Sequence, residues 1–195
     1  MDEGRTMQYR YLIGLGDSIM FGARDEYHSS PGLEATKLLR ERTGVNYFCI
    51  TRAISGETTG QLLKRVYDNL HGIDATIVLC LIGTNNTKPG KILPLTVYNS
   101  MLQMIKTVCH AEGKKVIFGQ IPFIRPGQFL GEYNSKSNEK ATEYNSVIRS
   151  ICPHAPNFYE LFRVHPEWIP DGIHPNNAGN VAMGKLWVEA IMSEL

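Results

Sequence analysis

The sequence predicts an α/β domain in which helices cover both faces of a five-stranded parallel sheet. Five short runs rich in β-branched or aromatic residues recur along the chain, at 9–15, 45–50, 75–82, 115–121 and 157–162. Segments whose apolar residues have helical spacing separate these runs. Because right-handed crossovers join strands that alternate with helices, we expect parallel strands between two helical layers. The arrangement is a three-layer α/β/α sandwich.

The third run is expected to be a central strand, because residues 75–82 are apolar at every position except Thr76. Helices are expected where the chain carries both apolar spacing and end signals. Ser30 and Pro31 begin one helix and Gly44 ends it. Thr58 and Gln61 form a capping box ahead of the next. Apolar spacing predicts further helices over residues 95–108 and 141–151, and a last helix from 176 or 177.

Length and composition limit the class of protein. The chain has 195 residues, and domains contain roughly 150, so a single domain is expected over residues 1–195. Apolar residues make up 43% and charged residues 20%, which excludes a disordered chain. Lys and Arg total 20 against 19 Asp and Glu. This balance offers no basic surface for nucleic acid or anionic lipid.

Nothing in the sequence indicates a membrane anchor or a secreted protein. The longest apolar run, residues 75–82, is too short to cross a bilayer, and the N-terminal residues 1–11 contain no apolar signal region. The four cysteines are far apart and form no C-x-x-C pair, so we expect buried, reduced thiols at Cys49, Cys80, Cys109 and Cys152. A cytoplasmic protein is the expectation.

Ligands of parallel sheets bind beyond the carboxyl ends of the strands, so the polar segments there are the candidate site. After the first strand, Gly16-Asp17-Ser18 can expose a serine hydroxyl whose amide lies at a helix N-terminus. The alternative is that Asp17 or Ser18 only caps the next helix. A dinucleotide loop is not supported, because Ile19 stands where the third glycine of G-x-G-x-x-G is required.

A second candidate lies near the C-terminus, where His174 follows Asp171 by three residues. A turn at Gly172 lets the carboxylate accept the histidine Nδ1–H, which leaves Nε2 free to act as a general base. The alternative is a turn aspartate and a histidine that both face solvent. Gly56 and Asn85, after the second and third strands, offer a backbone N–H and a side-chain amide, although turns also favour these residues.

Four blocks, taken together and in order over residues 16–174, resemble the SGNH hydrolase family, also called the GDSL esterases and lipases. They are Gly16-Asp17-Ser18, Gly56, Gly83-Thr84-Asn85 and Asp171-Gly172-Ile173-His174. The resemblance implies a flavodoxin-like α/β/α fold, with Ser18 as nucleophile, His174 as base and Asp171 as its orienting partner.

It also implies an oxyanion hole formed by the amides of Ser18 and Gly56 and the Asn85 side chain, and a reaction that needs no metal or other cofactor. One position departs from the family pattern. Asn86 stands where the family usually has Asp, and we expect it to support the loop.

The connector at 122–133 is long and aromatic, and we expect it to supply substrate contacts. Phe123, Phe129 and Tyr133 either contact the substrate or anchor the loop, and Asp17 is counted with them as a substrate-binding candidate.

The expected function is hydrolysis of a small-molecule carboxylic ester with a short acyl group or an O-acetylated carbohydrate. The same triad also serves acyltransferases, thioesterases and lysophospholipases. A catalytically silent binding domain on this fold is the remaining alternative.

Overall fold

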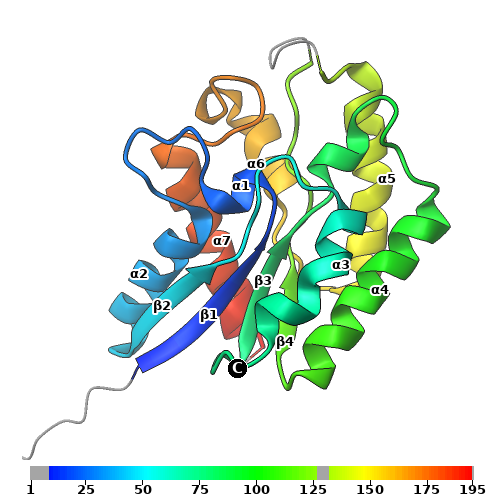
Figure 1. Ribbon diagram of the computed structural model, residues 1–195. Coiled ribbons are helices and arrows are strands. Elements are labelled where there is room, and N and C mark those ends of the chain that lie inside the picture. Colours follow the sequence, from blue (N-terminus) through cyan, green and yellow to red (C-terminus); the bar gives the residue numbers. More distant parts are fainter. Residues whose placement is uncertain (1–8, 127–131, 195) are drawn as a thin grey trace, which may run out of the picture.

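Four parallel strands form the sheet (Figure 1). The computed structural model describes residues 9–126 and 132–194. The strands lie in the order β2-β1-β3-β4, with bounds β1 Tyr9–Gly16, β2 Asn46–Thr51, β3 Ile77–Leu81 and β4 Lys115–Phe118. The predicted α/β class and parallel sheet are confirmed.

Strand β3 lies inside the sheet, as its composition predicts. It pairs with β1 on one side, where Leu15 is opposite Cys80, and with β4 on the other, where Cys80 is opposite Phe118. All five of its residues are buried. Since helices cover both faces, neither face of this strand carries a polar side chain.

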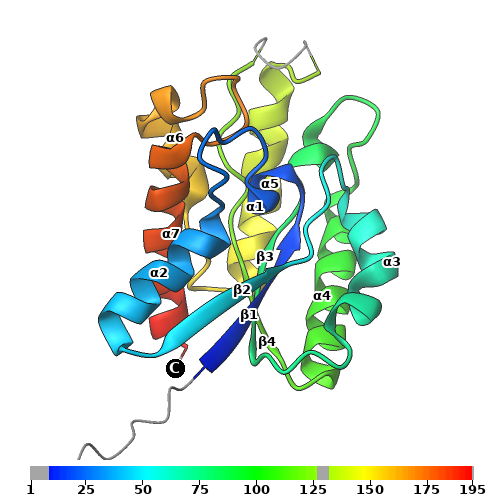
Figure 2. The ribbon, with the colours of Figure 1, turned by 60° about the vertical axis from the view of Figure 1, so that its left-hand side comes forward.

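Helices cover the two faces of the sheet unequally, with α2 and α7 on one side and α3, α4 and α5 on the other (Figures 1 and 2). Short 3-10 turns lie at 84–87 and 166–168. The helices are α1 Ser18–Phe21, α2 Pro31–Thr43, α3 Thr59–Leu70, α4 Leu95–Ala111, α5 Ser135–Ile151, α6 Phe158–Val164 and α7 Asn177–Met192.

The expected helix ends are found where the sequence places them. Ser30 Oγ accepts a hydrogen bond from the Leu33 amide over 3.2 Å, and α2 ends where Gly44 takes a φ of 71°. At the start of α3, the Thr58 amide donates to Gln61 Oε1 over 2.9 Å. No helix among the described residues is both long enough and apolar enough to span a bilayer. The four cysteines are free thiols.

The prediction of a fifth strand at residues 157–162 is wrong, because this segment begins helix α6. Phe158 and Phe162 are fully buried and four residues apart, a spacing that places them on one side of a strand and of a helix alike. The helix is decided by its N-terminus, where Asn157 Oδ1 accepts from the Glu160 amide over 3.1 Å. The turn before this helix bonds to the segment just after β4, where the Gln120 amide donates to the Pro156 carbonyl over 3.0 Å.

At the end of β1 the backbone passes very close to β3. Gly16 has a φ of 147°, and a Cβ at this position would lie 2.1 Å from the Leu81 carbonyl oxygen. The next amide, of Asp17, donates to the same oxygen over 3.3 Å. Only glycine fits here, and its turn directs the chain into α1.

Gly16→Ala is therefore expected to lower the free energy of unfolding by about 3 kcal/mol or more, through steric overlap added to an unfavourable φ. The matched control is Gly44→Ala, at a φ of 71° with no atom within 4 Å of the new Cβ. This control carries only the conformational term, about 1 kcal/mol. Urea unfolding measures both, and equal losses would contradict the close approach.

Candidate active site

Ser18 is the first residue of α1 and lies at the carboxyl end of the sheet. Asp17 caps this short helix, because its Oδ1 accepts a hydrogen bond from the Ile19 amide over 3.0 Å. The capping alternative thus applies to Asp17, and the role of Ser18 stays a prediction. Asp17 is the buried cap, and Ser18 presents its hydroxyl to the cavity described below.

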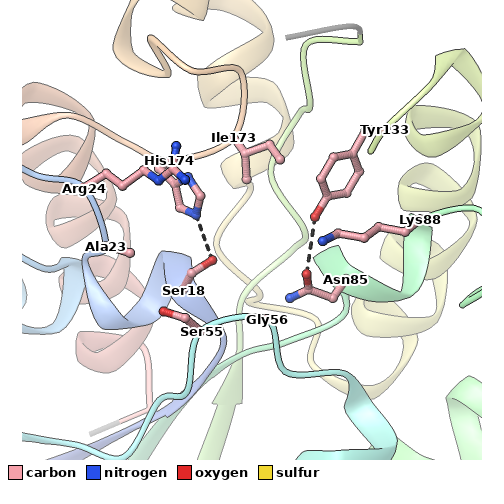
Figure 3. A pocket seen from close by; sticks show the side chains of 10 residues that line it. All are labelled: Ser18, Ala23, Arg24, Ser55, Gly56, Asn85, Lys88, Tyr133, Ile173 and His174. Carbon is pink, nitrogen blue, oxygen red and sulfur yellow. Dashed lines mark hydrogen bonds between the residues drawn. The ribbon is translucent and has the colours of Figure 1, made fainter. Parts of the chain in front are cut away.

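Ser18, His174 and Asp171 form a continuous hydrogen-bonded chain. His174 Nε2 lies 2.9 Å from Ser18 Oγ (Figure 3). On the other side of the ring, His174 Nδ1 lies 2.7 Å from Asp171 Oδ2. The second contact assigns the Nδ1 proton to the bond with the carboxylate, so Nε2 faces the serine hydroxyl as an acceptor. The arrangement allows the histidine to take a proton from the serine.

The carboxyl group of Asp171 is held in its charged form. Partial burial opposes ionisation, but the pKa of Asp171 is well below its ordinary value because the His174 ring and the amides of His174 and Ile173 all donate to the carboxylate. Arg24, whose side chain is mostly exposed, adds an ion pair in which its guanidinium nitrogen lies 3.2 Å from Asp171 Oδ2. Asp171 therefore stays an acceptor for His174 across the neutral range.

A cavity of about 170 Å³ opens beside Ser18. In Figure 3, Ser18 and His174 form one wall, and Asn85, Lys88 and Tyr133 form the opposite wall. Of the residues that the sequence nominates, five line this cavity, namely Ser18, Gly56, Asn85, Tyr133 and His174.

Two nominated substrate contacts do not reach the cavity. Asp17 has no exposed surface, because its side chain turns back to cap α1. The Phe123 ring packs edge-on against Tyr159 with 5.7 Å between centroids, so it anchors its connector to the body of the protein. Phe129 lies outside the described residues.

Asn85 is held on both sides of its amide. Its Nδ2 donates to the Glu57 carbonyl over 3.0 Å, and its Oδ1 accepts from the Tyr133 hydroxyl over 3.4 Å. Figure 3 shows Nδ2 directed toward Gly56 and Ser18. The amide nitrogen carries two hydrogens, so one is available to a ligand while the other is bound to Glu57.

The Asn86 side chain joins its loop to two other segments of the chain. Its Oδ1 accepts from the amide and the hydroxyl of Thr59, at 2.9 and 2.8 Å, and its Nδ2 donates to the Lys91 carbonyl over 3.3 Å. A carboxylate would keep the two contacts with Thr59 but has no hydrogen for Lys91. An amide therefore suits the loop of this chain.

Sequence reasoning missed several residues that line the cavity, notably Arg24 and Lys88. Basic side chains in loops ordinarily lie at the surface, so their residue type does not mark them as cavity residues. The one signal in the sequence is that both follow closely after polar segments at strand ends. Ala23, Ser55 and Ile173 also line it. Among the residues that the structure describes, no three His, Cys, Asp or Glu side chains are grouped as ligands of a metal would be.

Burial shifts the acidity of Asp17. Removal from water raises the pKa of the Asp17 carboxyl from 3.8 to about 7, and the Ile19 amide and the His174 ring offset this only in part. In the unfolded chain the group ionises near its ordinary pKa. Folding therefore favours the protonated acid, so stability conferred below pH ~4 is lost as the pH rises to about 7.

Asp17→Asn is expected to become more stable relative to wild type as the pH rises from about 4 to about 7, and to change little above this range. The amide oxygen keeps the cap on Ile19 and cannot ionise. Urea unfolding of both proteins across this range gives the difference directly. A difference that does not vary with pH would show that burial leaves the Asp17 pKa unchanged.

Comparison with known proteins agrees with this geometry. A model of the GDSL-like lipase/acylhydrolase family matches residues 15–182. An arylesterase of Vibrio mimicus is 30% identical over 169 residues, which cover 84% of this chain and 79% of that protein. The structure of a lipase/acylhydrolase from Enterococcus faecalis has a TM-score of 0.75 at 24% identity, covering 95% of this chain and 97% of its own.

A second solved structure, the acetyl xylan esterase AlAXEase, has a TM-score of 0.74 at 19% identity, covering 93% of this chain and 99% of its own. The family match extends from the end of β1 into α7 and includes Ser18, Asn85 and His174. This chain therefore belongs to the GDSL-like lipase/acylhydrolase family and is a carboxylic ester hydrolase.

Proposed function

We propose that this protein hydrolyses small carboxylic esters with short acyl groups through a Ser-His-Asp triad and an acyl-enzyme. The observation that carries the proposal is the hydrogen-bonded chain from Ser18 through His174 to Asp171 at the edge of a cavity. Nucleophile, base and orienting carboxylate stand in the order and at the separations that acyl transfer to serine requires.

The reaction has two halves. Ser18 Oγ attacks the ester carbonyl carbon while His174 Nε2 takes the hydroxyl proton, and Asp171 stabilises the resulting imidazolium. His174 then returns the proton to the leaving alcohol as the C–O bond breaks. Water, activated by the same histidine, attacks the acyl-enzyme and releases the acid and free Ser18. The net change is one ester and one water converted to one acid and one alcohol.

The oxyanion of the tetrahedral intermediates is assigned to three donors, which are the Ser18 amide, the Gly56 amide and Asn85 Nδ2. Gly56 supports this role because it lines the cavity at a φ of 80° and has no side chain to block a ligand. Asn85 supports it because its amide is fixed by Glu57 and Tyr133 before any substrate binds. Fixed donors stabilise charge without having to reorganise.

The size of the cavity favours short acyl groups. Pockets for drug-sized ligands have about 300–1,000 Å³, and this one has about 170 Å³. An O-acetylated carbohydrate is a candidate of this kind, and the likeness to an acetyl xylan esterase favours it. Transfer to another alcohol in place of water is the alternative, and a burst assay with added acceptor alcohols distinguishes the two.

The test is hydrolysis of p-nitrophenyl esters from acetate to octanoate. We expect the acetyl and butyryl esters to be hydrolysed faster than the octanoyl ester, and Ser18→Ala to lower kcat by about 10⁴-fold or more. The matched control is Ser55→Ala, which removes the other serine hydroxyl that lines the cavity. Reaction with a serine-directed phosphonate should persist in this control and vanish in Ser18→Ala. The reverse pattern would make Ser55 the nucleophile.

A second expectation concerns the oxyanion. Asn85→Ala should lower kcat by ~10²–10³-fold with little change in KM, because the lost hydrogen bond strengthens only as charge develops on the oxygen. Asn86→Ala is the comparison. It leaves the Thr59 amide without its partner and is expected to lower the unfolding free energy by about 2 kcal/mol, with less than roughly a tenfold loss in kcat. Similar kcat losses in both variants would assign Asn85 a structural role.

A further inference from the structure

The charged side chains that line the cavity are both basic. Two basic side chains, Arg24 and Lys88, line it, and no Asp or Glu is among its described lining residues. Arg24 lies on the same wall as His174. Its charge is already paired with the carboxylate of Asp171. Lys88 stands on the opposite wall, and Figure 3 shows its ammonium group directed into the cavity. No step of the proposed hydrolysis uses this group.

The Lys88 side chain is mostly buried and is held by two neighbouring residues, Glu132 and Tyr133. Its side chain is only 16% exposed, and its Nζ lies 5.0 Å from the centroid of the Tyr133 ring. Its carboxylate partner, Glu132, is 40% exposed and does not line the cavity. An anion in the cavity can therefore reach the ammonium group, and the mostly buried position of Lys88 lowers the screening of their attraction by water.

The chemistry of the triad decides which part of an ester faces Lys88. His174 must protonate the leaving alcohol, so the alcohol oxygen lies on the His174 side of the carbonyl carbon. The oxyanion points toward Gly56 and Asn85. We place the remaining substituent, the acyl chain, beside the oxyanion, toward the part of the same wall that Lys88 and Tyr133 form.

We propose that the acyl group selected by this site is short and ends in a carboxylate, which pairs with the ammonium of Lys88. The substrate class is thus a monoester of a small dicarboxylic acid. This inference rests on the proposed ester hydrolysis and goes beyond it, because the triad alone has no preference for a charged acyl group. Water cleaves the acyl C–O bond of the monoester, giving the dicarboxylate, the free alcohol and one proton, which passes to solvent.

The probes are monoethyl succinate and ethyl succinamate, which have the same shape and differ in a terminal carboxylate or carboxamide. Proton NMR of the released ethanol gives kcat/KM for each ester. The readout is the ratio of the charged to the neutral ester, and it is measured in wild type and in three variants. These are Lys88→Met, Glu132→Gln and, as the matched control, Lys91→Met, which removes an exposed lysine from the same loop.

In wild type the ratio should exceed one. Lys88→Met should lower it by about tenfold or more, since a hydrogen bond between charged groups is lost. Glu132→Gln should raise it, because a competing carboxylate is removed, and Lys91→Met should leave it unchanged. These two opposite shifts are not produced by general damage to the active site.

A ratio below one in wild type, or equal proportional losses on both esters in Lys88→Met, would overturn the inference and leave the ester hydrolysis intact. The same holds if p-nitrophenyl acetate is hydrolysed and neither ethyl ester is. Absence of hydrolysis with every ester, p-nitrophenyl acetate included, would overturn the proposed function and this inference with it.

Discussion

The contact between β1 and β3 at Gly16 and Leu81 determines where Ser18 lies. The two strands end side by side, and the backbone of β1 can turn there only because position 16 has no side chain. The Asp17 amide binds the same Leu81 oxygen, and the Asp17 carboxyl closes the first turn of α1. Ser18 is thus fixed by backbone contacts on one side and by a helix cap on the other.

The opposite wall of the cavity depends on a second set of contacts, which joins the loops after β2 and β3. Glu57 lies at its centre, buried and paired with Arg65, while its backbone carbonyl binds Asn85. Asn86 ties the same loop to Thr59 at the start of α3. Burying the charge of Glu57 is unfavourable unless it is paired, so Arg65 is needed for the loop to stay in place. Asn85, a proposed oxyanion donor, is therefore held in place by residues that do not line the cavity.

The sequence predicts those parts of the molecule that depend on neighbours in the chain. Helix ends are of this kind, because Ser30, Gly44 and Gln61 act within four residues of themselves. The polar segments at strand ends are also found, since parallel strands bring them to one edge of the sheet. Segment 157–162 was misassigned because its two buried phenylalanines fit both periods.

Other features depend on contacts between distant segments and have no local signal. The environment of the buried Asp17 carboxyl, for example, includes Glu57, Thr84 and His174, which are distant in the sequence. The directions of Arg24 and Lys88 depend on Asp171, 147 residues away, and on Glu132, 44 residues away. The spacing of residues along the chain gives no information about such long-range contacts. These contacts decide whether a side chain lines the cavity or only lies near it.

The hydrogen bond between Ser18 and His174 joins residues 156 positions apart. During synthesis on the ribosome the serine therefore emerges well before the histidine. His174 lies just before α7, and α7 packs on α2 to complete its layer. A nascent or truncated chain that lacks this segment holds a serine without its hydrogen-bond partner, and under the proposed mechanism that serine has the reactivity of an ordinary alcohol. Under the proposed mechanism, reactivity at Ser18 thus reports that the chain has been made as far as His174 and has folded.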